Sequence, residues 1–175
     1  MSLSAYPQRN DHERLRELAR LGVDREQGRA YLTDIVETVA ERLQTPFALV
    51  TGLLSDAQVF LAGRGPVPAW IAEAGGTPVE WAFCCRLLDQ RAAFTVPDFT
   101  TDPEFRNNPL VTIEGVRSYI GAPLVSAGGQ VLGGLCALDV RPREFGAEQL
   151  SALQELADEA VRRMEDEVRT DDPAG

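Results

Sequence analysis

Three cysteines are the residues of this sequence whose chemistry is easiest to define. Cys84 and Cys85 are adjacent in mid-chain, and Cys136 follows much later. A thiol enzyme needs a thiolate close to a cation or a helix N-terminus, together with a second, resolving thiol. Arg86 is a candidate cation, and Cys84 on a helix with Cys136 on a strand is the pair that would face one pocket. The simpler interpretation, which we favour, is that these free cysteines pack as small hydrophobic side chains.

A second group of candidates combines one carboxylate, one guanidinium and three aromatic rings. Asp98 follows a short apolar run and a proline, so it can accept a hydrogen bond from a ligand or from its own turn. Paired with Arg117, it would form either a ligand clamp or a structural salt bridge. Phe99, Phe105 and Tyr119 would line an apolar pocket or pack beneath a loop. The residue types alone leave both alternatives open.

The composition excludes several classes of partner. The chain has 175 residues, 44% of them hydrophobic, and a formal net charge of −10. Such an acidic surface repels phosphate backbones and anionic lipid, so we expect no nucleic-acid or membrane partner. No apolar run approaches the roughly 20 residues of a membrane span, and the N-terminus lacks the features of a signal peptide. With an odd number of cysteines, we expect reduced thiols and a cytoplasmic location.

Metal or cofactor chemistry is not indicated either. His12 is the only histidine, and the carboxylates are scattered without ligand spacing. No glycine-rich loop that would cradle a phosphate is present. We therefore expect no cofactor.

The first part of the chain predicts two helices followed by a hairpin. Apolar residues recur at helical spacing and then in a short buried run that ends at a turn. The expected elements are helices at 12–21 and 25–43 and strands at 47–54 and 58–62.

The clearest local signal in the sequence is Thr77-Pro78-Val79-Glu80. Thr77 is a good N-cap residue, Pro78 suits the first helical position, and Glu80 would complete a capping box. This pattern predicts a helix that begins after Thr77 and ends near Asp89.

The remaining part predicts a strand, a long loop, a hairpin and a final helix. Loops this long are uncommon in compact domains unless they have a function such as covering a pocket. The expected ranges are strand 92–96, loop 98–115, strands 118–125 and 130–139, and helix 146–169.

The order of these elements predicts an α+β fold. No two strands are joined by a regular helical crossover, which excludes a parallel sheet and favours an antiparallel one of five strands. The helices at 25–43 and 146–169 would cover one face, and the helix near 77–89 with the long loop would cover the other. We expect a single domain over residues 11–169, with flexible tails at 1–10 and 170–175.

In its motifs the chain resembles the GAF family of small-molecule sensor domains. The similarity is strongest to bacterial members found beside histidine kinase and diguanylate cyclase modules, and it extends over roughly residues 25–169. The motifs occur in the family's order and are Phe83-Cys84, Val96-Pro97-Asp98, Asp102-Pro-Glu-Phe-Arg106, Asn108-Pro-Leu-Val111, Arg117-Ser-Tyr-Ile-Gly-Ala-Pro-Leu124, Gly133-Gly-Leu-Cys-Ala-Leu-Asp139 and Arg141-Pro-Arg-Glu-Phe145.

This resemblance implies a profilin-like, PAS-related fold with an antiparallel sheet of five to six strands and helices on both faces. It also implies a ligand pocket beneath the mid-chain helix and loop, and dimerisation through the terminal helices. The motif of cyclic-nucleotide-binding members and the cysteine context of bilin-binding members are not present. The expected ligand-binding residues are Phe83, Cys84, Asp98, Phe99, Phe105, Arg117, Tyr119 and Cys136.

The final helix carries a heptad-like apolar seam. Its apolar residues alternate three- and four-residue steps, and together with a leucine stripe near the N-terminus the seam is wider than one sheet face requires. We therefore predict a homodimer formed through the terminal helices. The seam consists of Leu150, Leu153, Ala157, Ala160 and Met164.

Three functional hypotheses follow. The first is a non-enzymatic sensory module for an unknown small molecule that acts in signal transduction through a protein partner. The second is a thiol-dependent enzyme of the free methionine sulfoxide reductase type, in which Cys84 would be essential. The third is a dimeric interaction module with a vestigial pocket.

Overall fold

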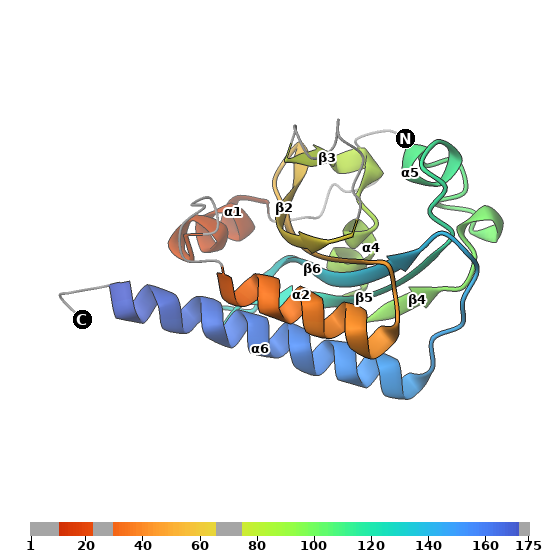
Figure 1. Cartoon of the computed structure of the whole chain (residues 1–175). Coiled ribbons are helices and arrows are strands. Elements are labelled where there is room, and N and C mark those ends of the chain that lie inside the picture. Colours follow the sequence, from red (N-terminus) through yellow and green to blue (C-terminus); the bar gives the residue numbers. More distant parts are fainter. Residues whose placement is uncertain (1–10, 23–29, 66–74, 172–175) are drawn as a thin grey trace.

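The computed structural model describes residues 11–22, 30–65 and 75–171. At its centre is a six-stranded antiparallel sheet with the strand order β3-β2-β1-β6-β5-β4, as Figure 1 shows. The strands are β1 (Phe47–Leu53), β2 (Ala57–Arg64), β3 (Gly76–Pro78), β4 (Phe94–Val96), β5 (Ser118–Val125) and β6 (Val131–Asp139).

Long helices cover one face of the sheet, and short helical segments cover the other. In Figure 1, α2 and α6 run side by side beneath the sheet, and α4 lies on the opposite side. The helical elements are α1 (Asp11–Arg20), α2 (Ala30–Leu43), η2 (Val79–Trp81), α4 (Cys84–Gln90), η3 (Phe99–Thr101), α5 (Pro109–Thr112) and α6 (Ala147–Asp171).

Alternation along the strands divides the core between these two faces. On β1, Ala48 and Val50 pack into the cluster formed with α2 and α6, whereas Leu49 belongs to the cluster on the α4 side. On β6, Ala137 and Cys136 divide in the same way, because successive side chains of a strand point to opposite faces. The predicted α+β antiparallel fold is therefore confirmed.

The capping-box prediction at Thr77 is wrong. Thr77 lies on β3 and pairs with Gln58 of β2, and its Oγ1 accepts a hydrogen bond of 3.0 Å from Gln58 Nε2. Pro78 is extended, with φ −57° and ψ 149°, and η2 that follows has no side-chain cap. The α-helix begins only at Cys84. Tertiary pairing with β2 thus overrides the local helix-start pattern and supplies the sixth strand.

The long loop contains more structure than the sequence predicts. Asp98 accepts a hydrogen bond of 3.0 Å from the Thr100 backbone amide and caps η3. Asn108 caps α5 by accepting a bond of 2.9 Å from the Leu110 amide. Side-chain caps of this kind satisfy backbone donors that short helices leave unpaired.

The apolar seam of α6 packs within its own chain. Leu153, Ala157, Ala160 and Met164 are almost fully buried in the cluster formed with α2 and the sheet. The seam therefore has partners without a second copy of the chain, and the homodimer stays a prediction. The domain limits also stay a prediction. Residues 1–10, 25–29 and 172–175 lie outside the described residues, and α6 continues to Asp171, two residues beyond the predicted end of the helix.

Candidate functional site

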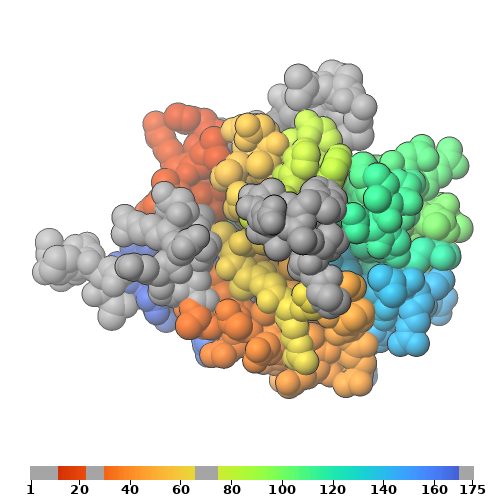
Figure 2. All heavy atoms as spheres, turned by 45° about the horizontal axis from the view of Figure 1, so that its top comes forward, coloured from red at the N-terminus to blue at the C-terminus, as the bar shows by residue number. Residues whose placement is uncertain are grey.

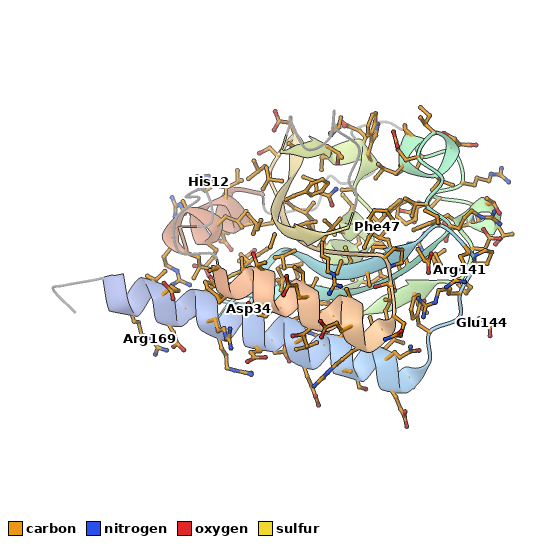
Figure 3. All side chains as sticks on the ribbon, viewed as in Figure 1. His12, Asp34, Phe47, Arg141, Glu144 and Arg169 are labelled. Carbon is orange, nitrogen blue, oxygen red and sulfur yellow. The ribbon has the colours of Figure 1, made fainter. Side chains whose placement is uncertain are left out.

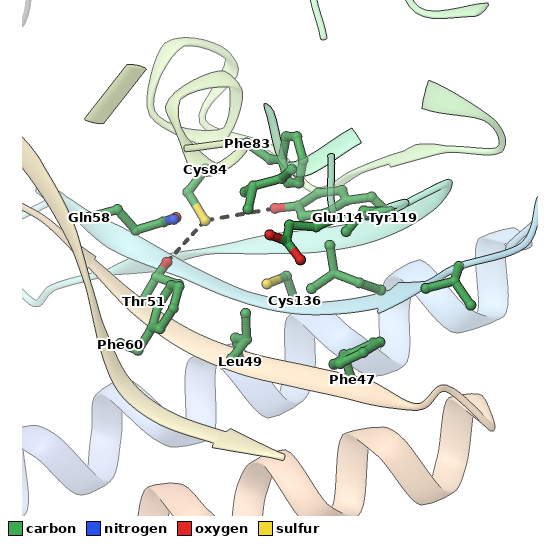
Figure 4. A pocket seen from close by; sticks show the side chains of 14 residues that line it. Phe47, Leu49, Thr51, Gln58, Phe60, Phe83, Cys84, Glu114, Tyr119 and Cys136 are labelled. Atoms are coloured by element: carbon green, nitrogen blue, oxygen red, sulfur yellow. Dashed lines mark hydrogen bonds between the residues drawn. The ribbon is translucent and has the colours of Figure 1, made fainter. Parts of the chain in front are cut away.

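A cavity of about 180 Å³ lies on the α4 side of the sheet. The first hairpin provides one wall, with Phe47, Leu49 and Thr51 from β1 and Gln58 and Phe60 from β2 (Figure 4). These side chains share one wall because alternate residues of paired strands point to the same face.

The opposite wall comes from α4, from α5 and from the segment that follows α5. Phe83 and Cys84 contribute from the start of α4, Leu110 from α5, and Glu114 and Val116 from the segment between α5 and β5. The loop is held in place beside η2, because Asn108 Nδ2 donates a hydrogen bond of 3.1 Å to the Trp81 carbonyl. In Figure 2 the green-to-teal loop segment stands beside the yellow-green η2 region on the same side of the molecule.

The neighbouring strands β5 and β6 form the floor of the cavity. Tyr119 of β5 and Cys136, Leu138 and Val140 at or after β6 line it. Val140 is 52% exposed, so the cavity reaches the surface on that side.

Two glycines make room for the side chains of the cavity. A Cβ at Gly134 would lie 2.6 Å from Leu87 Cδ1 and 3.0 Å from Cys84 Sγ, so its absence lets α4 approach the sheet. A Cβ at Gly121 would lie 2.2 Å from the Tyr119 hydroxyl, so the tyrosine side chain lies over this glycine. Both positions explain why the two strands are punctuated by glycine.

A cluster of thiol and hydroxyl groups lies at the inner end of the cavity. Cys84 Sγ is 3.0 Å from Thr51 Oγ1 and 3.8 Å from the Tyr119 hydroxyl, as the dashed lines in Figure 4 show. Thr51 Oγ1 accepts a hydrogen bond of 3.2 Å from the Gly134 amide, which leaves its proton to be donated to the sulfur or to the Gly134 carbonyl. The Cys136 thiol is also buried and forms a hydrogen bond with the Cys84 sulfur.

Proton affinities within this cluster differ. The hydrogen bond from Cys136 lowers the pKa of Cys84, and Thr51 and Tyr119 act in the same direction against the effect of burial. The same contact raises the pKa of Cys136 well above its ordinary value, because Cys136 then holds the shared proton. Burial raises the pKa of Tyr119, so its hydroxyl remains a donor.

The structure brings four of the eight predicted ligand-binding residues to the cavity, namely Phe83, Cys84, Tyr119 and Cys136. The other four lie elsewhere in the fold.

Asp98 and Arg117 form an ion pair, with Arg117 Nη2 2.8 Å from Asp98 Oδ2 and Nε 2.9 Å from Oδ1. This ion pair holds the pKa of Asp98 well below its ordinary value. Of the two roles left open by the sequence, the observed geometry is that of the structural pair.

Phe99 and Phe105 are buried in an aromatic cluster behind the cavity. The Phe83 ring stacks on Phe99 at 4.3 Å between centroids and meets Phe105 edge to face at 5.1 Å. Tyr119 meets Phe83 at 5.5 Å. The two loop phenylalanines therefore support two residues that line the cavity.

Arg86, the candidate cation for a thiolate, has carboxylate partners. Its guanidinium lies 2.9 Å from Asp102 Oδ1 and 2.8 Å from Glu104 Oε2, and it stacks over Phe105 at 4.4 Å and Phe94 at 5.1 Å. Burial opposes the charged form, but the two carboxylates raise the pKa of Arg86. This Arg86 cluster ties α4 to the long loop.

Sequence reasoning missed the wall formed by the first hairpin. Thr51 and Gln58 are its polar members, and both are buried within β-strands. Polar residues inside otherwise apolar strands are the signal that would have indicated them. Glu114 also lines the cavity and was not predicted.

His12, the only histidine of the sequence, lies on α1, away from the cavity residue Phe47 (Figure 3).

With the fold and cavity defined, the chain can be compared with known proteins. The model of the GAF domain matches residues 29–164, which is most of the sequence. This chain belongs to the GAF domain family. This match confirms the resemblance seen in the motifs, and GAF domains typically serve as sensing modules in signalling proteins.

One curated relative is a cyclic di-GMP phosphodiesterase of Pseudomonas aeruginosa. It is 35% identical over 156 residues, which represent 89% of this chain and 25% of the relative. The chain therefore spans about a quarter of the length of that protein.

Solved structures agree with the fold of this GAF domain. The free methionine-R-sulfoxide reductase of Neisseria meningitidis has a TM-score of 0.66 at 20% identity and covers 91% of each chain. The GAF domain of an Acinetobacter phosphoenolpyruvate-protein phosphotransferase has a TM-score of 0.66 at 15% identity, covering 91% of this chain and 98% of its own. At these identities the likeness concerns the fold alone.

The described residues contain neither a metal-binding cluster nor a membrane-spanning helix. Residues 11–22, 30–65 and 75–171 contain no group of three or more His, Cys, Asp or Glu side chains placed to hold a metal ion. Within the same part of the chain, no helix combines the length and the hydrophobicity that a membrane span requires.

Proposed function

We propose that this GAF domain is a sensory module that binds a small molecule with an apolar body in the cavity beside α4. The observation that carries the proposal is a preformed, largely apolar cavity with a few polar groups at fixed places, which is the usual form of a small-molecule site. Thr51, Gln58 and Tyr119 supply hydrogen-bonding groups to orient such a ligand.

The charge of the cavity narrows the class of ligand. Among the described residues that line it, Glu114 is the only charged one, and none is a cation. A buried anion without a cationic partner is strongly unfavourable. The ligand we propose is therefore neutral or positively charged, and phosphates and carboxylates are disfavoured.

The same cavity connects with the elements that would transmit a signal. Its floor is formed by β5 and β6, whose opposite faces pack against α6 and α2. A ligand would shift these helices only if it binds one arrangement of them more tightly than another. A protein partner would read that shift, with a homodimer as the proposed assembly.

Native mass spectrometry of the purified protein tests this proposal first. We expect a non-covalent mass on the chain that is lost on denaturation, and the same spectrum reports whether the chain is a dimer. Thermal unfolding with benzyl alcohol, benzylamine and benzoate then tests the charge preference, because the three share one apolar body. The neutral and cationic compounds should raise the melting temperature and benzoate should not.

A cavity-blocking variant provides the control. Leu49→Trp places a large ring inside the cavity and should abolish the shift in melting temperature. Ser55→Trp adds the same ring in an exposed turn and should preserve it. The proposal is wrong if native mass spectrometry detects no bound mass and none of the three compounds raises the melting temperature. It is also wrong if benzoate raises the melting temperature as much as benzylamine does.

A second candidate function is thiol-dependent reduction of free methionine sulfoxide. It is supported by the proximity of Cys84 and Cys136 in one cavity and by the fold shared with the Neisseria reductase. Turnover of methionine sulfoxide with a thiol reductant, lost in Cys84→Ser, would favour it. Absence of turnover in the unmodified protein would exclude it. The vestigial-pocket hypothesis has less support, because side chains do not fill the cavity.

A further inference from the structure

The three cysteines of this protein have different surroundings. Cys84 and Cys136 line the cavity, whereas Cys85 is buried without lining it, and its thiol is 3.7 Å from the Val79 carbonyl. All three are buried, with Cys84 only 1% exposed and Cys85 3% exposed. Cys84 and Cys85 are therefore equally buried but differ in two ways. The cavity reaches Cys84 and not Cys85, and different groups surround each sulfur.

The groups around Cys84 favour a nucleophilic sulfur. The Thr51 hydroxyl is 3.0 Å away with a proton to donate, and the Tyr119 hydroxyl is 3.8 Å away. Cys136 supplies a third donor from the neighbouring strand. Donors directed at a sulfur stabilise its thiolate, which is the reactive form of cysteine. Cys85 instead donates to a carbonyl, which holds its proton in place.

The space in front of Cys84 Sγ selects what can reach it. The surrounding side chains include Phe83, Leu49 and Phe60, and the only charged residue among the described lining residues is Glu114. A cavity of about 180 Å³ admits a small molecule but not a peptide or a protein thiol. An anionic reagent would be desolvated there without a cationic partner among the described lining residues.

We propose that Cys84 is a covalent capture site for small, uncharged electrophiles that carry a carbon–carbon double bond conjugated to a carbonyl group. This inference rests on the proposed function, because it requires that the cavity admits small molecules. It goes further by assigning a reactive atom and a chemical class of ligand.

The reaction is an addition that needs no other reactant. A bond forms between Cys84 Sγ and the β-carbon, and the π bond of the alkene breaks. Its electron pair moves towards the carbonyl group, which passes through an enolate. The proton that leaves the Cys84 thiol is returned to the α-carbon, and Cys136 and the Tyr119 hydroxyl are close enough to relay it. The product retains all atoms of both reactants.

Capture at this site would convert a transient encounter into a lasting signal. The adduct would occupy the cavity against Phe83 and Tyr119, which belong to the aromatic cluster under the loop. Cys84 also lies two positions from Arg86, whose ion pairs hold the loop to α4.

N-Ethylmaleimide and 3-maleimidopropionate provide a matched pair of probes, because they carry the same electrophile and differ in charge. The folded protein is treated with each, and the adducts are located by intact mass and peptide mapping. We expect one fast adduct with N-ethylmaleimide, on Cys84, and a rate lower by about tenfold or more with the anionic probe, because an unpaired anion is costly to bury. Free cysteine serves to normalise the two rates.

Three variants assign the site. Cys84→Ser should lose the fast adduct, Cys85→Ser should keep it, and Cys136→Ser should give the same adduct more slowly. Circular dichroism verifies that each variant is folded. The inference is overturned if Cys85 reacts as fast as Cys84, if the anionic probe reacts equally well, or if modification follows the rate of unfolding.

An unreactive analogue separates failure of this inference from failure of the proposed function. N-Ethylsuccinimide has the shape of the maleimide without the double bond. If it raises the melting temperature but N-ethylmaleimide gives no adduct on Cys84, covalent capture is wrong and the sensory site stands. If the analogue does not bind and no adduct forms, covalent capture is wrong, and the sensory site fails with it only if native mass spectrometry detects no bound mass and none of the benzyl compounds binds.

Discussion

The two faces of the central sheet are built by the same strands but covered in different ways. On one face, α2 and α6, of 14 and 25 residues, bury aliphatic side chains in one large cluster. On the other, α4 and α5, of 7 and 4 residues, leave a cavity beside a cluster of aromatic rings.

This difference shows how one sheet can be tightly packed on one face and keep a cavity on the other. A long amphipathic helix satisfies its own backbone and presents a continuous apolar stripe. Short helical segments leave more of their backbone unpaired and present no such stripe. They are held instead by the caps of Asp98 and Asn108 and by the ion pairs of Arg86. The face held by such discrete contacts is the one that contains the cavity.

The largest effect is expected from a ring of the aromatic cluster. Phe99 is fully buried and stacks on Phe83, so Phe99→Ala should lower the free energy of unfolding by about 3–5 kcal/mol. Denaturant titration measures this loss. Phe99→Leu, which keeps much of the apolar volume, should cost less. A loss as small as that of a surface substitution would show that the cluster is not part of the core.

A leucine on the closed face should cost nearly as much. Leu153 is 1% exposed between α6 and the sheet, so Leu153→Ala should lower the free energy of unfolding by about 2–5 kcal/mol. Leu49→Ala, which enlarges the existing cavity from a half-buried position, is the matched comparison and should cost clearly less. Equal losses in the two variants would contradict the contrast between the faces.

The Arg86 cluster should affect the loop more than the whole domain. Arg86→Met leaves the mostly buried Asp102 carboxylate without its cation, which should cost about 1–3 kcal/mol. Hydrogen exchange should accelerate at the amides of Glu104 and Phe105, which bond to Asp102 Oδ1. Exchange on α6 should remain unchanged. Acceleration at both places would mean that the two faces are not independent.

The smallest effect is expected at the edge of the closed face, where Arg20 joins Glu17 and Glu165. The hydrogen bonds from Arg20 lower the pKa of both carboxylates. A lowered folded-state pKa gives stability that is present above the unfolded value of about 4.3 and is lost as the pH falls through the folded value. Because these groups are partly exposed, Arg20→Ala should cost less than about 1 kcal/mol at pH 7.

Denaturant titrations of the unmodified protein and of Arg20→Ala at a series of pH values check this expectation. The difference between them should shrink as the pH falls below about 4, where the carboxylates become protonated. A difference that stays constant across this range would show that Arg20 acts through packing instead of charge.

The class of fold and the family could be predicted from residue patterns alone. Strand and helix patterns are set by residues close together in the chain, and the strand predicted at 118–125 coincides with β5. Where local and tertiary signals compete, the local one fails. Thr77 and Glu80 form a sound helix-start pattern, yet Thr77 pairs with Gln58 because the edge of β2 offers backbone partners that a capping box cannot match.

The full lining of the cavity could not be predicted from the sequence, because it depends on tertiary packing. Phe83, Cys84, Tyr119 and Cys136 were among the residues expected at the site, but Thr51 was not. Its hydroxyl meets Cys84 across a separation of 33 residues. Which side chains share an enclosed space depends on how distant segments pack and on the room that Gly134 provides. Spacing along the chain does not encode that geometry.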